Sequence, residues 1–129
     1  MYKHYNPNPM RSAAGDCVIR ALCAVLGESW RDVYTALSVQ GYMMGDWGNS
    51  DSVWGAYLRS RGFERHSLPN TCPDCYAVGD FARDHQSGAY VLGTGSHAVA
   101  VIGGDVYDSF DSSGMIPVFF YERSGSNGV

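Results

Sequence analysis

The stretch GDCVIRAL at residues 15–22 decides the fold expected for this chain. It opens a predicted helix over about 16–26, which Gly27 ends. Apolar residues occupy nearly every side of this helix, and Arg20 is its lone charged residue after Cys17. A helix that is apolar on nearly all sides is buried. We therefore predict that the rest of the domain packs around it.

The second half of the chain changes to the alternation typical of β-strands, most clearly in SHAVAVIGGDVYDSFD at residues 96–111. A tight turn is predicted at Gly103-Gly104. Two more helices are expected in the first half, and Ser29 with Asp32 resembles a capping box at the first of them. The expected helices span about 29–39, 50–62 and 78–85, and the expected strands span 63–68, 89–93, 96–102, 106–110 and 116–121.

This order of elements predicts an α+β fold, with an N-terminal buried helix and further helices packed on a C-terminal antiparallel sheet. Residues 1–123 are expected to form a single domain, followed by a flexible tail at 124–129. The first 14 residues are expected to be an extended arm, because Pro7 and Pro9 hold their neighbours out of the helical region.

Composition excludes several function classes. The 129 residues carry a net charge of −4, which offers no basic surface for nucleic acid. No apolar run approaches the length of a membrane span, and the N-terminus has no apolar signal segment. We therefore expect a cytoplasmic protein whose four cysteines are thiols. The oligomeric state is left open.

Cys17 is predicted at the first turn of the buried helix, with Asp16 as its cap. The helix dipole favours an anion there, and backbone N–H groups lack partners. A thiol needs such help, since the free thiol, with a pKa near 8.5, is a weak nucleophile. The alternative is that Cys17 is a small buried apolar residue, as free cysteines often are.

His97 begins one strand of the predicted hairpin, and the returning strand carries aspartates. If the loop is only Gly103-Gly104, Asp108 is the diagonal neighbour of His97 on the same face. If the loop has three residues, Asp111 lies opposite His97 instead. We favour Asp108 because it lies inside the predicted strand.

The motifs GDCVIRAL, GSHAVAVIGG and VYDSFDSS together resemble papain-like-fold cysteine peptidases, particularly the compact prokaryotic and phage members. Bacteriocin leader peptidases are more distant relatives in the same fold. The NPNP arm and the CPDCY turn are also similar to those of small phage and prophage proteins of gut Firmicutes. The resemblance implies Cys17 as nucleophile, His97 as general base and acid, and Asp108 as the residue that orients His97.

The chain differs from the papain-like family at the oxyanion hole. Papain-like enzymes usually place a glutamine six residues before the cysteine, where this chain has Arg11. Asn6 and Asn8 in the arm are candidate donors in its place.

The function expected from these residues is a cysteine-dependent hydrolase, acting as a peptidase, isopeptidase or amidase through a thioester, without a cofactor or metal. Its substrate would be a peptide or protein, in a bacterial host cell. The alternative is a non-catalytic papain-like binding module of phage origin that blocks a host protein.

Two other features leave alternatives open. Cys72 and Cys75 form a CxxC that we favour as a structural turn, over a zinc site with His66 and His85 or a redox pair. The glycine-rich segment GYMMGDWGNS at residues 41–50 either lines a substrate cleft as an apolar subsite or packs as ordinary core.

Overall fold

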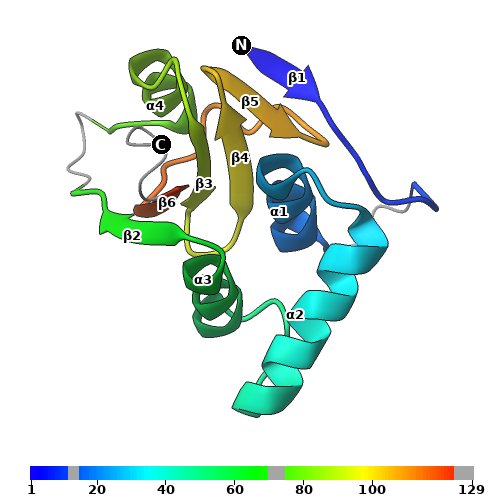
Figure 1. Ribbon diagram of the computed structural model, residues 1–129. Helices are drawn as coiled ribbons and strands as arrows, with labels where there is room; N and C mark the ends of the chain where they lie inside the picture. The colour runs from blue at the N-terminus through cyan, green and yellow to red at the C-terminus, as the bar shows by residue number, and fades with distance from the viewer. Residues whose placement is uncertain (12–14, 70–74, 124–129) are drawn as a thin grey trace.

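A computed structural model describes residues 1–11, 15–69 and 75–123. These residues form four helices packed on a six-stranded mixed sheet, an α+β fold as predicted (Figure 1). The predicted tail at 124–129 lies outside the described residues. The helices are α1 (Cys17–Leu26), α2 (Trp30–Met44), α3 (Asp51–Ser60) and α4 (Val78–Asp84). The strands are β1 (Tyr2–His4), β2 (Phe63–Ser67), β3 (Ala89–Gly93), β4 (Ala98–Ile102), β5 (Asp105–Asp108) and β6 (Phe119–Arg123).

The sheet differs from the antiparallel C-terminal sheet expected from the sequence. Its order is β1-β5-β4-β3-β6-β2, and β1 from the N-terminal arm pairs in parallel with β5, where His4 is the partner of Asp108. The arm was expected to be extended but not part of the sheet. A three-residue strand is too short to show alternation, and its partner lies about a hundred residues away. Only the folded chain identifies that pairing.

Helix α1 is the buried central helix that its composition predicts. It lies between the sheet and α2 (Figure 1) and ends at Gly27, whose φ of 66° is the left-handed conformation that glycine favours. Ala98 and Ala100 of β4 share a core with α1, and small side chains at these positions let the helix approach the sheet closely. The alternate residues of β4, Val99 and Val101, pack with α4 on the opposite face. The sheet is thus covered on both faces.

His97 lies one residue before β4 begins, whereas the sequence placed it inside the strand. Alternation would place a His97 inside the strand on the face of Val99 and Val101, which pack with α4. Because His97 lies before the regular strand, this alternation does not fix its side chain. The His97 side chain lies beside Cys17, at the N-terminus of α1.

Helix α2 runs to Met44, five residues beyond the predicted end at 39. The Ser29 side chain accepts a hydrogen bond from the backbone N–H of Asp32 at 3.1 Å, which confirms the predicted cap. The last turn escaped the sequence pattern because Tyr42, Met43 and Met44 are exposed apolar side chains where polar residues are typical, and the buried position before them is a glycine. None of the helices in the described part of the chain has the length and apolar content that crossing a membrane requires.

Candidate functional site

Cys17 is the first residue of α1 and lies half-buried at the mouth of a cavity of about 500 Å³. The helix N-terminus directs its unpaired backbone N–H groups towards this end. His97 lines the same cavity from the start of β4. The full lining is His4, Asn6, Arg11, Gly15, Cys17, Arg20, Ser96, His97, Ser109 and Phe110.

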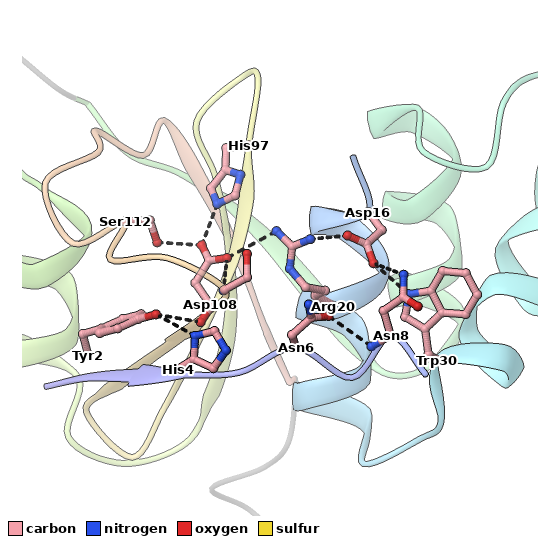
Figure 2. Close-up of polar contacts among 11 residues, drawn as sticks. Tyr2, His4, Asn6, Asn8, Asp16, Arg20, Trp30, His97, Asp108 and Ser112 are labelled. Atoms are coloured by element: carbon pink, nitrogen blue, oxygen red, sulfur yellow. Dashed lines mark hydrogen bonds and ion pairs between the residues drawn. The ribbon is translucent and has the colours of Figure 1, made fainter. Parts of the chain in front are cut away.

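The hairpin turn brings His97 against Asp108. Ile102 pairs with Asp105, so the loop is the predicted two residues, Gly103-Gly104. The Nε2 atom of His97 lies 2.6 Å from Oδ2 of Asp108 (Figure 2). Since Nε2 is engaged by the carboxylate, Nδ1 is the ring nitrogen left to face the thiol.

Asp108 is almost fully buried, and both of its carboxylate oxygens accept hydrogen bonds. Oδ2 accepts from His97 and from the Ser112 hydroxyl at 2.7 Å, while Oδ1 accepts from the backbone N–H of Ser109 at 2.7 Å. Burial raises the pKa of Asp108, but these donors outweigh burial and hold it below its usual value. Asp111, the alternative partner, is exposed and accepts from the backbone N–H of Ser113.

The thiol and the imidazole shift each other's titration. Burial raises the pKa of Cys17, but hydrogen bonds from His97 and from the backbone of Ala98 lower it. The lowering outweighs burial, so the pKa of Cys17 lies below its usual value. The hydrogen bond to Asp108, followed by that to Cys17, raises the pKa of His97 to about 9. Both directions favour a thiolate beside an imidazolium at neutral pH.

Arg20 links Asp108 to a second buried carboxylate, Asp16, and sequence reasoning missed this link. Asp16 occupies the N-cap position of α1, but its side chain makes no capping hydrogen bond, contrary to expectation. Instead it forms an ion pair with Arg20 and accepts from Trp30 Nε1 at 2.9 Å (Figure 2). Arg20 also lies 3.3 Å from Oδ1 of Asp108. The available signal was a single arginine, four residues after an aspartate, in an otherwise apolar helix.

The two candidate oxyanion donors of the arm take different places. Asn8 is buried, and its side-chain Nδ2 donates to Asp16 while its Oδ1 accepts from the backbone of Met10. It does not line the Cys17 cavity. Asn6 does line it; its Oδ1 accepts from the backbone N–H of Asn8, and its Nδ2 donates no hydrogen bond to the described residues.

Cys75 of the CxxC motif and the two histidines that flank the motif do not line this cavity. Cys75 is disulfide-bonded, which corrects the expected thiol, and Cys72 lies outside the described residues. His66 stacks on Phe120 and lies 2.9 Å from Oε1 of a glutamate on β6. His85 stacks on the Phe81 ring at 3.7 Å. Within the described ranges, no three histidine, cysteine or carboxylate side chains gather as a metal site would require.

Comparison with known proteins finds no relative, so the function is argued from the geometry of the site. No protein-family model, no curated protein and no solved structure matches the chain.

Proposed function

We propose that this protein is a cysteine-dependent hydrolase of amide, peptide or isopeptide bonds, with Cys17 as nucleophile, His97 as general acid and base, and Asp108 as the residue that orients His97. One observation carries the proposal. A single cavity holds a thiol at a helix N-terminus and a histidine whose far nitrogen lies 2.6 Å from a buried carboxylate. This is the relation of nucleophile, base and orienting group that acyl transfer requires.

In the first half-reaction, the Cys17 thiolate attacks the carbonyl carbon of the substrate, and a C–S bond forms as the carbonyl π electrons move to oxygen. When the tetrahedral intermediate collapses, the C–N bond breaks and His97 gives its proton to the departing amine. The products of this half are a free amine and a thioester on Cys17. His97 is left neutral, with Asp108 still holding Nε2.

In the second half-reaction, neutral His97 takes a proton from water while the water oxygen attacks the thioester carbonyl. The C–S bond breaks, the carboxylic acid product leaves, and the thiolate and imidazolium are restored. The raised pKa of His97 supplies the protonated ring that the first half-reaction needs. Acylation of Cys17 then removes the thiolate that contributes to this raised pKa, which favours the neutral ring that acts as base in the second half-reaction.

The tetrahedral oxyanion needs hydrogen-bond donors in the cavity. The backbone N–H of Cys17 is one, since it lies in the first turn of α1 and lacks an intrahelical acceptor. The Asn6 side-chain amide supplies the second, because it lines the cavity with its Nδ2 free of described partners. Arg11, which occupies the position of the usual glutamine, also lines this cavity.

A papain-like arrangement is part of the proposal. It is supported by a nucleophile at the N-terminus of a buried central helix. It is also supported by a histidine just before β4 and a carboxylate at the end of β5, two adjacent strands that pack against that helix. The resemblance of the motifs to phage and prophage proteins supports a peptide or protein substrate in the cytoplasm of a bacterial host.

Thiol alkylation tests the proposal directly. At pH 6.5 a free thiol is only about 1% thiolate, so Cys17 should react with iodoacetamide faster than a model peptide thiol. Cys23 is an internal control: it is buried, and burial raises the pKa of its thiol to about 12. Intact mass of the unreduced protein should therefore show one rapid addition, absent in Cys17→Ser and slowed in His97→Gln.

Turnover is tested with a mixture of tryptic peptides from an unrelated protein, followed by mass spectrometry. The wild type should create new termini, with the two product masses summing to the parent plus one water, and Cys17→Ala should create none. A Cys17 that reacts at pH 6.5 no faster than a free thiol contradicts the enzyme, and favours the non-catalytic binding module.

A further inference from the structure

A second cavity, of about 720 Å³, adjoins the Cys17 cavity, and Gly15 lines both. This cavity, called the aromatic pocket below, lies between the N-terminal arm, α1, α2 and the loop that follows α2. It is lined by Asn8, Met10, Gly15, Asp16, Ile19, Trp30, Tyr34, Leu37, Ser38, Tyr42, Asp46, Trp47, Gly48 and Asn49.

Large apolar side chains of the aromatic pocket are exposed. Trp47 is 80% exposed and Tyr42 87%, and Tyr34 and Met10 are exposed as well. Tyr34 stacks on Trp30 with ring centroids 5.1 Å apart, so one wall presents a double aromatic layer. Leaving this much apolar surface in water is unfavourable, and such patches mark binding sites.

The loop that carries Trp47 is firmly built. Asp46 accepts hydrogen bonds from the Trp47 backbone N–H at 2.7 Å and from the Ser50 hydroxyl at 2.9 Å. The loop backbone packs so tightly on α2 that a Cβ at Gly41 would lie 2.5 Å from the Asp46 carbonyl oxygen. A Cβ at Gly48 would lie 3.1 Å from a carbonyl of α2. Trp47 is therefore exposed although its loop is held in place by hydrogen bonds and by packing on α2.

The carboxylates of the aromatic pocket and the Asn8 side chain are already engaged. The Asp16 carboxylate is paired with Arg20, the Asn8 side chain bonds to Asp16 and to backbone, and Asp46 closes its own loop. No described carboxylate in this pocket is left to select a cation. What remains is mainly apolar and aromatic surface, which selects an apolar or aromatic side chain.

Gly15 connects the two cavities. It is exposed, and a Cβ built there would meet no atom of the described residues within 4 Å. An extended peptide can pass this open position, with its scissile carbonyl near Cys17 and a neighbouring side chain in the aromatic pocket.

We propose that the aromatic pocket is a substrate subsite that binds a bulky apolar or aromatic side chain of a peptide, near the bond cleaved by Cys17. The inference rests on the proposed function, since it names the substrate class of that site. A peptide is favoured over a second copy of this chain because the surface is a concave pocket that shares Gly15 with the nucleophile cavity. Its volume is within the range of ligand pockets, about 300–1,000 Å³.

The test uses electrophilic peptide probes that react with the active-site thiol. The probes are tetraglycine vinyl sulfones in which a single Phe is moved one position at a time, with the all-glycine peptide as reference. Labelling rates are measured by intact mass and divided by the iodoacetamide rate of the same protein. This ratio removes differences in the intrinsic reactivity of Cys17.

One Phe position should react at least about tenfold faster than the all-glycine probe, a discrimination typical of an apolar pocket. Trp47→Ala and Tyr42→Ala should remove most of that preference. Both side chains are exposed, so these variants are expected to fold. Met43→Ala is the matched control: Met43 is also exposed, is the neighbour of Tyr42 on α2, and lines neither cavity.

The outcomes separate the two proposals. Fast iodoacetamide labelling with equal rates for all peptide probes overturns the subsite and leaves the hydrolase standing. If iodoacetamide labelling is not enhanced, the hydrolase fails. The pocket is then tested alone, by adding an acetylated Phe peptide amide to Cys17→Ser and following the tryptophan emission that is lost when Trp47→Ala is added to this variant; no shift in that emission overturns the pocket. A dimer in sedimentation that Trp47→Ala dissociates overturns the subsite in favour of a self-interface.

Discussion

Arg20 should be the most consequential charged residue for stability, and replacing it with Met tests this. The guanidinium is buried and pairs with two buried carboxylates, Asp16 and Asp108. Met has a similar length and fills the same apolar surroundings, so packing is largely kept. The change therefore isolates the loss of the positive charge.

The loss of stability in Arg20→Met depends on the hydrogen-bond and ion-pair partners that each carboxylate retains. Asp108 retains His97 at 2.6 Å and the Ser112 hydroxyl at 2.7 Å, so it still faces an imidazolium. Asp16 retains only the neutral donors of Trp30 and Asn8, and it becomes a buried anion without a cation. Breaking a buried pair from one side costs about 3–5 kcal/mol. We expect about 3 kcal/mol, because only one of the two anions loses its last cation.

Urea unfolding at pH 7 measures this cost. A loss of about 3 kcal/mol lowers the midpoint by roughly 2 M for a domain of this size. Arg61→Met is the control: Arg61 pairs with Glu28 at 2.6 Å, but both side chains are about one-third exposed. It should cost no more than about 1 kcal/mol.

One result would refute the reasoning on Arg20: a loss below about 1 kcal/mol at pH 7, similar to that of the exposed control pair.

Three further predictions concern the hairpin and the sheet. Asp108→Asn should lower the pKa of His97 from about 9 in an NMR titration, whereas Asp111→Asn should not; equal shifts would contradict the role of Asp108. Relative to His97→Gln, the wild type should keep its full stability advantage below pH about 6.5 and lose it as the pH rises through about 9; a constant difference would be inconsistent with a raised pKa. Gly93→Ala should lower the free energy of unfolding in urea by about 1–3 kcal/mol, because the added Cβ would lie 2.2 Å from a buried aromatic ring of β6. The control Gly114→Ala should lower it little, because a Cβ there meets no atom of the described residues within 4 Å.

Much of the local structure followed from residue patterns. The run of apolar residues after Cys17 predicted α1, and Gly27 predicted its end. Alternation predicted β3 at its observed bounds, and the Gly103-Gly104 pair predicted a two-residue turn. These patterns reflect steric and hydrogen-bonding preferences of neighbouring residues, which act within a few positions of the chain. The limits of β4 and β5 were less accurate, and His97 fell outside its strand as a result.

The candidate site itself depended on both kinds of information. The sequence by itself determined a thiol at a helix start and a histidine and an aspartate across a tight turn, because the turn length sets the register of a hairpin. Only the tertiary structure decided that β1 joins the sheet, that Arg20 links Asp16 to Asp108, and that the pocket lined by Trp47 shares Gly15 with the Cys17 cavity. The physical reason is distance along the chain. These contacts form when α1 is buried between the sheet and α2, and no local pattern encodes which buried charges will then meet.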